Sequence, residues 1–329
     1  MPFSSTVPLA RETVGARHAK LVWADTDKPG WRRQRRGKGW RYVDESGDTI
    51  SGEERARLET LAVPPAWKNV WLSPSERAHI LATGEDDAGR TQYIYHPEWR
   101  RVRDEAKFAD MLEFGRGLPA LRRQVQTRLL ELDEPVDFAC ACIVRLLDKG
   151  ALRIGKEGRT SAIGAVSLCN AHVDIHDELL ELHYVGKGGK ARDILIEDKL
   201  LIDAVKHLQQ LPGQALFEVE GHCITSQDVN EFIHELTGRA FSAKDFRTWS
   251  GSTAATEVLM REEKPTLKAL SEAAAARLGN TPAIAKKSYI HPAIMTLAAN
   301  GDALPAADGP TRLLSAERQL MGIMAASSK

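Results

Sequence analysis

The residues around position 289 are of types, and at a spacing, that could carry chemistry. Tyr289 follows Lys286, Lys287 and Ser288, and Asn280 lies a short distance upstream. A phenol titrates near pH ~10, so tyrosine is a poor nucleophile in water. It is useful where a phosphodiester must be opened without losing its energy, because the phosphotyrosyl bond that forms can be reversed. A half-buried packing residue is the ordinary alternative for a tyrosine in such a stretch.

Three upstream segments contain the cations that such a reaction requires. Arg153 emerges from an apolar run just after a helix that is expected to end near Gly150. Lys187 lies in a glycine-rich turn between two strand-like stretches. Arg247 lies in a polar turn that leads into a helix. Each has a structural alternative: a capping or ion-pairing arginine, a solvated turn lysine and a helix-start residue, respectively.

In the order Arg, Lys, Arg, Asn, Tyr, these positions resemble the active site of the type IB DNA topoisomerases, in their bacterial and poxvirus-like branch. The family patterns R-[IF]-G, [FY]-V-G-K, K-D-[LF]-R-T, G-[HN]-T-P and K-S-Y are matched in order by Arg153-Ile154-Gly155, Tyr184-Val185-Gly186-Lys187, Lys244-Asp245-Phe246-Arg247-Thr248, Gly279-Asn280-Thr281-Pro282 and Lys287-Ser288-Tyr289. Together these short motifs are a specific signal, although each alone would be weak. The resemblance extends over nearly the whole chain.

The resemblance implies a mechanism for each matched position. Tyr289 would attack a phosphorus in one strand of duplex DNA and form a 3′-phosphotyrosyl link, leaving a free 5′-hydroxyl. Arg153 and Arg247 would hold the charge on the nonbridging oxygens, because the guanidinium fork matches phosphate geometry. Asn280 would donate a further hydrogen bond, and Lys187 would protonate the departing 5′-oxygen as a general acid. The open strand would swivel, supercoils would relax, and religation would follow without ATP, a metal ion or any other cofactor.

The partner implied by the resemblance is duplex DNA, bound by a monomer at the nucleoid in the cytoplasm. In the family, the segment that matches Arg90, Gln92, Tyr93 and Tyr95 contacts bases and phosphates in the major groove. Lys244 is a further expected DNA contact. Arg and Gln suit this task because they can form bidentate contacts with base edges. An edge strand with both tyrosines on one face is the structural alternative.

A second basic segment lies near the N-terminus. Its cations crowd around Trp31 and Trp40: Arg32, Arg33, Arg35, Arg36, Lys38 and Arg41. Cations interleaved with aromatic rings suit a nucleic-acid backbone, because Lys and Arg displace condensed counterions. A solvated face or a flexible arm is the alternative.

The composition is that of a folded protein, with 43% hydrophobic and 27% charged residues in a chain of 329. The formal net charge is zero. Acidic residues are concentrated at 53–54, 85–87 and 131–134, so a basic groove is compatible with a neutral total. The sequence shows no apolar run long enough for a membrane span, no secretion signal in residues 1–13, and no ATP-binding or metal-ligand motif. Its four cysteines form no CxxC pair, which predicts free thiols in a reducing cytoplasm.

We expect an α+β protein whose two domains form a bilobed DNA clamp. Residues 1–96 are predicted to form a small β-rich cap domain that binds DNA. Residues 97–329 are predicted to form a larger, mainly α-helical catalytic domain of the topoisomerase IB and tyrosine recombinase type. Its small β-sheet is expected at 164–168, 172–175, 179–185 and 192–196. Its helices are expected at 98–115, 118–132, 136–149, 197–211, 226–237, 248–262, 266–278, 281–300 and 315–326.

Two departures from the family pattern accompany this interpretation. The segment 156–164 is shorter than the usual turn and lacks the aromatic residue that commonly touches phosphate. Asn280 replaces the histidine of the viral members. Two alternatives also stand. A tyrosine recombinase or integrase shares the chemistry, but it usually has H-x-x-R where this chain has Lys244-Asp245-Phe246-Arg247, and its N-terminal domain is helical. A noncatalytic DNA-binding protein with a decayed site is the other, although all five positions hold chemically competent residues.

Overall fold

A computed structural model describes residues 20–132, 134–156 and 162–327 of the chain. The chain divides into two compact units, Met1–Ala109 and Asp110–Lys329. The predicted domain boundary at 96/97 coincides with the start of helix α3, Pro97–Ala109, and this helix groups with the N-terminal unit. Residues 1–13, whose sequence lacks the pattern of a secretion signal, and most of the shortened segment that follows Arg153 lie outside the described residues.

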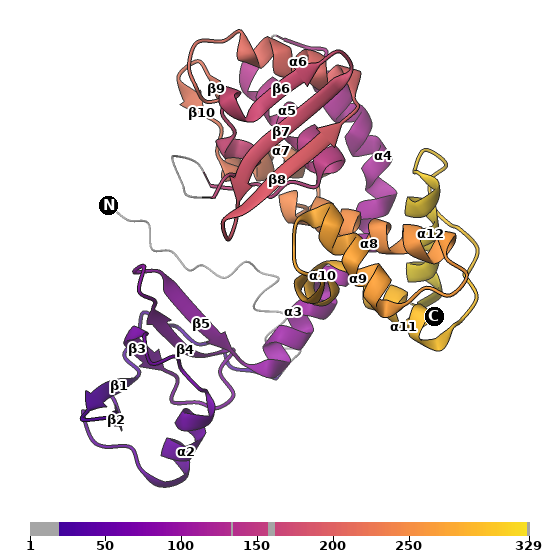
Figure 1. Ribbon diagram of the computed structural model, residues 1–329. Helices are drawn as coiled ribbons and strands as arrows, with labels where there is room; N and C mark the ends of the chain where they lie inside the picture. The colour runs from indigo at the N-terminus through magenta and orange to yellow at the C-terminus, as the bar shows by residue number, and fades with distance from the viewer. Residues whose placement is uncertain (1–19, 133, 157–161, 328–329) are drawn as a thin grey trace. The chain divides into compact units, whose positions relative to one another are not determined.

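The N-terminal unit is built on one antiparallel sheet (Figure 1). Its strands are β1 (Trp31–Arg36), β2 (Gly39–Val43), β3 (Lys68–Leu72), β4 (Ile80–Glu85) and β5 (Thr91–Tyr95). They lie in the order β2-β1-β3-β4-β5, and each is antiparallel to its neighbour. Helix α2 (Gly52–Thr60) places Leu58 in a core with Tyr42 and Leu72. The predicted β-rich character of this unit is confirmed.

Burial divides the basic segment of β1. Arg33 is only 9% exposed, whereas Arg32 and Arg35 on either side are exposed. The Arg33 guanidinium carbon lies 4.0 Å from the ring centroid of Trp40. The guanidinium donates hydrogen bonds of 2.7, 2.9 and 3.0 Å to three carbonyl oxygens, those of Val63, Pro64 and Trp67. Arg33 is therefore a structural cation, and only its exposed neighbours can contact a polyanion.

The second unit is mainly helical and contains a small sheet, which confirms the predicted fold class. Its helices are α4 (Met111–Arg128), α5 (Pro135–Gly150), α6 (Lys199–Gln209), α7 (Ser226–Thr237), α8 (Ala243–Arg261), α9 (Leu267–Leu278), α10 (Pro282–Tyr289), α11 (Pro292–Asn300) and α12 (Ser315–Ser327). A three-stranded antiparallel sheet contains β6 (Val173–His176), β7 (Leu179–Gly186) and β8 (Lys190–Ile196), and β9 (Glu218–Val219) pairs with β10 (His222–Cys223). Helix α5 contacts α4, α6, α7 and α8, and is buried throughout 138–144.

Four predicted elements differ from the structure. The helix expected at 248–262 begins at Ala243, so Arg247 lies within it and not in a turn before it. The expected break at 116–117 is wrong, because the helices separate at Asp110 and α4 continues through Gly115, whose missing side chain lets the Trp249 ring pack against the helix. The expected strand at 164–168 is a 3₁₀ turn, Ala165–Ser167, in which the Ser167 hydroxyl accepts a hydrogen bond from the Gly164 N–H at 3.0 Å. The expected helix at 281–300 is two helices, α10 and α11, because Pro292 has no N–H with which to continue the first.

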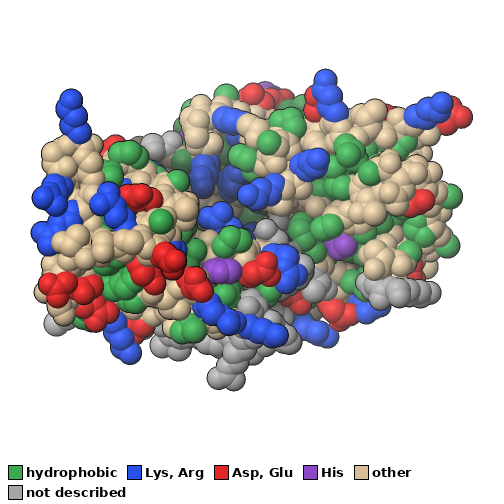
Figure 2. Space-filling view, turned by 90° about the horizontal axis from the view of Figure 1, so that it is seen from below, with side chains coloured by type: hydrophobic (Ala, Val, Ile, Leu, Met, Phe, Trp, Pro, Cys, Tyr) green, Lys and Arg blue, Asp and Glu red, His purple; other side chains and the backbone are tan. Residues whose placement is uncertain are grey.

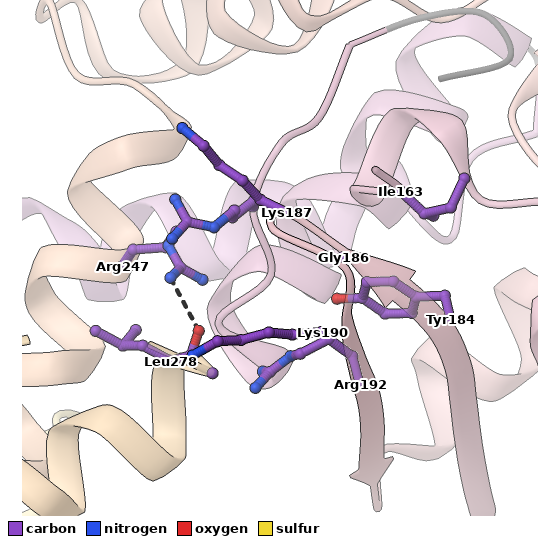
Figure 3. A pocket seen from close by; sticks show the side chains of 10 residues that line it. Ile163, Tyr184, Gly186, Lys187, Lys190, Arg192, Arg247 and Leu278 are labelled. Atoms are coloured by element: carbon purple, nitrogen blue, oxygen red, sulfur yellow. Dashed lines mark hydrogen bonds between the residues drawn. The ribbon is translucent and has the colours of Figure 1, made fainter. Parts of the chain in front are cut away.

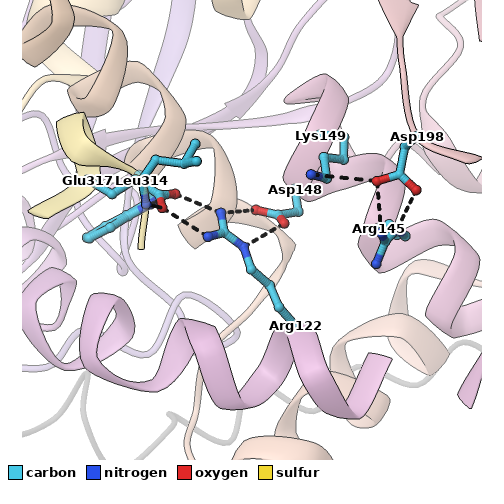
Figure 4. Close-up of polar contacts among 8 residues, drawn as sticks. Arg122, Arg145, Asp148, Lys149, Asp198, Leu314 and Glu317 are labelled. Atoms are coloured by element: carbon cyan, nitrogen blue, oxygen red, sulfur yellow. Dashed lines mark hydrogen bonds and ion pairs between the residues drawn. The ribbon is translucent and has the colours of Figure 1, made fainter. Parts of the chain in front are cut away.

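A buried ion network joins four helices of the second unit (Figure 4). Arg122 of α4 donates to Asp148 of α5 at 2.9 Å and to Glu317 of α12 at 2.7 Å. Glu317 is only 3% exposed and also accepts from Trp249 Nε1 of α8 at 2.9 Å. Burial would raise the pKa of Glu317, but the bonds from Arg122 and Trp249 hold that pKa below its usual value. The network therefore ties α8 to the rest of the helical unit.

Removing the central cation of this network is expected to destabilise the fold. Arg122→Met should lower the free energy of unfolding by about 3–5 kcal/mol, because it leaves two buried carboxylates without their partner. Urea denaturation at pH 7 measures the change. The control is Lys199→Met, whose ion pair with Asp203 at 3.1 Å is largely exposed and should contribute little. Equal losses in the two variants would contradict the special role of Arg122.

Candidate active site

The first predicted site residue, Arg153, follows an abrupt helix end. Helix α5 ends at Gly150, and Ala151 adopts a left-handed conformation with φ 51°, its N–H bonded to the Leu147 carbonyl. The chain then runs without regular secondary structure through Arg153 to Gly155, where φ is +84° and the backbone packs directly on Gly164. A side chain at Gly155 would be strained and would collide with this neighbour. The Arg153 side chain thus extends from a segment whose backbone conformation is tightly fixed.

Lys187 lies in the β7–β8 hairpin, as the glycine-rich pattern predicts. The strands pair up to Gly186 and Lys190, and the turn contains Gly188 and Gly189 at φ +81° and +72°. Lys187 itself is exposed, and it lines a pocket together with Arg247 (Figure 3). Lys187 therefore reaches the pocket from the hairpin, whereas Arg247 reaches it from helix α8.

Arg247 is held by the backbone of two distant segments. Helix α8 begins with a capping box formed by Ser242 and Asp245, so Arg247 lies in its first turns. The residue is 4% exposed; its Nη1 donates to the Ala151 carbonyl and its Nη2 to the Leu278 carbonyl at 3.0 Å. Burial and the nearby charge of Arg153 lower the pKa of Arg247 to about 10. The guanidinium therefore stays charged at neutral pH although it is buried.

Asn280 lies just before helix α10, and Tyr289 is its last residue. Gly279 ends α9 in the left-handed conformation, and Thr281 caps α10 by accepting from the Ile284 N–H. Arg153 Nη2 donates to Asn280 Oδ1 at 2.6 Å. The Asn280 Nδ2 atom is buried and has no hydrogen-bond partner among the described residues. Because arginine can only donate, this bond fixes the amide with its NH₂ group turned away from Arg153.

Tyr289 is the last residue of α10 and lies among guanidinium groups. Its hydroxyl is 3.5 Å from Arg153 Nη1, and its ring centroid is 5.2 Å from the Arg247 guanidinium carbon. Burial alone would raise the pKa of Tyr289, but the charges of Arg247 and Arg153 outweigh this effect and the pKa is lowered. The structure thus places the phenol where loss of its proton is favoured.

The structure brings all five predicted site residues to one region of the second unit. Arg153, Lys187 and Arg247 line the same pocket, and Asn280 and Tyr289 reach it through their contacts with Arg153. Two further cations line the pocket and were missed in the sequence, Lys190 and Arg192. Arg192 lies opposite Tyr184 in the β7–β8 register, so strand alternation from the lysine motif is the signal that could have found it.

The predicted DNA-contacting residues Arg90 and Gln92 lie on the β4–β5 hairpin of the N-terminal unit, where one carboxylate holds both. Asp86 Oδ2 accepts from Arg90 Nε and from Gln92 Nε2, each at 2.9 Å. The hydrogen bonds from Arg90 lower the pKa of Asp86 to about 2, so the carboxylate is charged at neutral pH. Sequence reasoning missed Asp86, although its position four residues before Arg90 in a tight hairpin is a recognisable signal.

The other predicted DNA contacts are also accessible. Tyr93 and Tyr95 stack on one face of β5, with ring centroids 5.7 Å apart, and Tyr93 is 42% exposed. This is also the arrangement of the structural alternative, an edge strand with both rings on one face. Lys244 is exposed in the first turn of α8, in the second unit.

Lys and Arg side chains gather at several places on the face shown in Figure 2, and some of them lie beside Asp and Glu side chains. The neutral total charge of the chain is therefore compatible with local positive surfaces. Within residues 20–132, 134–156 and 162–327, every helix is too short or too polar to cross a membrane. The same residues contain no group of three or more His, Cys, Asp or Glu side chains that could hold a metal ion.

Comparison with known proteins identifies the family. Residues 96–299 match the family model of the eukaryotic DNA topoisomerase I catalytic core, and residues 39–86 match that of the bacterial DNA topoisomerase IB N-terminal domain. DNA topoisomerase 1B of Acanthamoeba polyphaga mimivirus is 26% identical over 277 residues, which cover 76% of this chain and 81% of the viral protein. Among solved structures, the XerH site-specific recombinase bound to palindromic difH substrate aligns with a TM-score of 0.34 and 15% identity, over 63% of this chain and 55% of the recombinase chain.

The catalytic-core match alone covers more than half of the chain and defines its class, an isomerase that acts on DNA. The chain belongs to the type IB DNA topoisomerases, in the branch with bacterial and viral members.

Proposed function

We propose that this topoisomerase relaxes supercoiled duplex DNA through reversible attack of Tyr289 on one strand. The phenolic oxygen loses its proton to water and bonds to the phosphorus, while the bond to the 5′-oxygen breaks and that oxygen gains a proton. A 3′-phosphotyrosyl link and a 5′-hydroxyl result. The free end swivels while the strand is open. The 5′-hydroxyl then attacks the phosphotyrosyl bond and releases the tyrosine. Because the energy of the broken bond is kept in the covalent link, no nucleotide need be hydrolysed.

The observation that carries this proposal is the position of the Tyr289 hydroxyl among charged guanidinium groups. Arg153 lies 3.5 Å from that hydroxyl, and Arg247 is buried beside the ring. A tyrosine that served only in packing would gain nothing from a partly exposed arginine and a second arginine that is costly to bury. A phosphoryl group on the phenol, in contrast, would give both guanidiniums the anionic oxygens that their forks match. Preorganised donors at such oxygens contribute roughly 3–4 kcal/mol each to transition-state stabilisation.

Asn280 and Lys187 complete the proposed machinery. The bond from Arg153 leaves the Asn280 NH₂ group as a donor for a nonbridging oxygen, without adding charge. Lys187 protonates the departing 5′-oxygen, a role that arginine cannot fill because it does not release its proton near neutral pH. Both assignments follow the family motifs and are compatible with the pocket of Figure 3.

Relaxation of supercoiled plasmid in EDTA without ATP tests this function. The expected result is full relaxation, together with a covalent DNA adduct that peptide mapping places on Tyr289. Strand exchange between two defined sites would instead favour a recombinase. If the protein bound DNA but neither relaxed it nor formed the adduct, the noncatalytic DNA-binding alternative would be favoured.

We further propose that the β4–β5 hairpin contacts DNA, with Arg90 and Gln92 held in place by Asp86. Arg90→Ala should lower DNA affinity and reduce the slope of log K against log salt by about one, because one phosphate-neutralising cation is lost. Gln92→Ala should leave this slope unchanged and alter sequence preference instead. Fluorescence anisotropy at several KCl concentrations distinguishes the two. Unchanged slopes and affinities in both variants would exclude the hairpin from the interface.

The monomeric state, the nucleoid location, the clamp arrangement and the domain limits at 96/97 stay predictions from the resemblance. Tyr93, Tyr95 and Lys244 are proposed DNA contacts on the same basis.

A further inference from the structure

Helix α8 contacts the nucleophile segment through a buried serine. Ser252 is 0% exposed, and its Oγ donates to the Tyr289 carbonyl oxygen at 3.0 Å. The same Oγ accepts from the His291 N–H, also at 3.0 Å. One hydroxyl thus uses its single proton and one lone pair on the two backbone groups that flank the end of α10. No part of this contact involves the Tyr289 phenol.

The chain needs an external partner at this point because α10 ends there. A continuing helix would satisfy the Tyr289 carbonyl from the N–H four residues later. Pro292 has no N–H, and the Ala293 N–H bonds to the His291 Nδ1 atom at 3.2 Å instead. Helix ends left in this way are prone to fray. Ser252 therefore supplies the fixed contact that the helix itself does not.

The residue before Ser252 allows the two backbones to touch. Gly251 is buried in α8, and a Cβ atom at this position would lie 3.0 Å from both the Cβ and the carbonyl oxygen of Tyr289. The same atom would lie 2.8 Å from the Leu278 Cδ1 atom. These distances are shorter than ordinary carbon contacts, so the nucleophile segment rests directly on the α8 backbone.

Helix α8 also contains Arg247, whose guanidinium donates hydrogen bonds to the Ala151 and Leu278 carbonyls. The arginine and the serine lie five residues apart in one continuous, largely buried helix. The separation between the guanidinium and the Tyr289 backbone is therefore set within a single rigid element. Catalysis is sensitive to such placement, since a displacement of about 1 Å can cost on the order of a hundredfold in rate.

We propose that Gly251 and Ser252 are positioning residues for the nucleophile, which hold Tyr289 at a fixed distance from Arg247. The proposal rests on the proposed function, in which Tyr289 attacks DNA. Neither residue touches the phenol or the substrate pocket, so their loss should affect the rate of attack and not the affinity for DNA.

Ser252→Ala tests the hydrogen bonds. We expect single-turnover formation of the covalent adduct to slow by about ten- to a hundredfold, while the Kd for DNA changes little. The melting temperature should fall moderately, because two backbone groups lose a buried hydrogen-bond partner. The control is Ser250→Ala in the same helix, where the lost bond is to Arg277 Nε at 3.2 Å. Ser250→Ala should cleave at nearly the wild-type rate. Wild-type cleavage by Ser252→Ala, or equal slowing in the two variants, would overturn the proposal.

Gly251→Ala tests the backbone contact independently of the serine. Alanine is the better helix former, so a slower cleavage could not come from weakened helix propensity. The control is Gly117→Ala in α4, where a Cβ meets no atom within 4 Å. We expect slow cleavage with retained DNA binding for Gly251→Ala alone. Normal cleavage by a folded Gly251→Ala variant would show that the contact does not position the tyrosine.

Two additional measurements separate this inference from the proposed function. A DNA substrate with sulfur in place of the 5′-bridging oxygen needs no proton on its leaving group, so it should not restore a variant whose nucleophile is misplaced. Ser252→Ala is expected to remain slow with it, and full restoration would contradict the positioning role. If Tyr289→Phe still forms the adduct, the proposed nucleophile is wrong. If Tyr289→Phe is inactive and Ser252→Ala is normal, only the positioning inference fails.

Discussion

Replacing Tyr289 by phenylalanine is expected to abolish DNA relaxation and covalent adduct formation. The change removes the only atom that bonds to phosphorus, and loss of a nucleophile costs on the order of a million-fold in rate. The ring is buried beside Ala151 and Leu278, and phenylalanine preserves that packing. The variant should therefore fold and bind DNA normally. Plasmid relaxation and denaturing-gel detection of the adduct measure the loss.

Tyr184→Phe is the matched control for this experiment. Tyr184 is also buried, at 8% exposure, and lines the same pocket, but no mechanism assigns chemistry to its hydroxyl. It should keep forming the adduct on Tyr289. If Tyr289→Phe still formed the adduct and Tyr184→Phe did not, the nucleophile would be Tyr184 of the β7–β8 hairpin and not Tyr289.

Replacing Lys187 by alanine is expected to slow strand cleavage by about 10²–10⁴-fold, the usual contribution of a general acid. Lys187 is exposed in a turn, so stability should be unaffected. The defect should disappear with a 5′-bridging sulfur substrate, because a thiol titrates near ~8.5 and leaves without protonation. Quenched-flow cleavage of the two substrates gives the comparison.

Two controls isolate proton donation from charge. Lys187→Arg keeps the positive charge but cannot release a proton near neutral pH, so it should stay slow on ordinary DNA. Lys190→Ala removes a neighbouring cation of the same pocket and should show a smaller loss that sulfur does not rescue. If Lys187→Arg cleaved ordinary DNA at the wild-type rate, Lys187 would supply charge alone.

The pocket shows how one cation can serve structure and chemistry together. The Nη1 and Nη2 groups of Arg247 donate hydrogen bonds to the Ala151 and Leu278 carbonyls. Its Nε atom is buried without a partner among the described residues. The carbonyl bonds fix the guanidinium before DNA binds, which reduces the reorganisation needed during the reaction. A substitution at Arg247 would therefore disturb both the fold and the charge at Tyr289. Lys187 is the cleaner probe, because it has only the second role.

The sequence by itself determined the features that depend on a few neighbouring residues. The left-handed Gly279 and the Thr281 cap with Pro282 are local signals, and each forms at a predicted helix boundary. The Ser242–Asp245 capping box is also a local signal, although the expected helix at 248–262 does not include it. The order of the five short motifs likewise identified the family, which the comparisons confirm.

The tertiary structure decided what depends on residues far apart in the chain. Arg153 meets Tyr289 across 136 positions, and Ser252 meets the Tyr289 carbonyl across 37. Residue types alone could not separate the buried Arg33 from its exposed neighbours, because that difference depends on which arginine meets the carbonyls at 63–67. The same is true of the pKa of Tyr289. It is set by charges that only packing brings together, and electrostatic interactions fall with distance in space and not with separation along the chain.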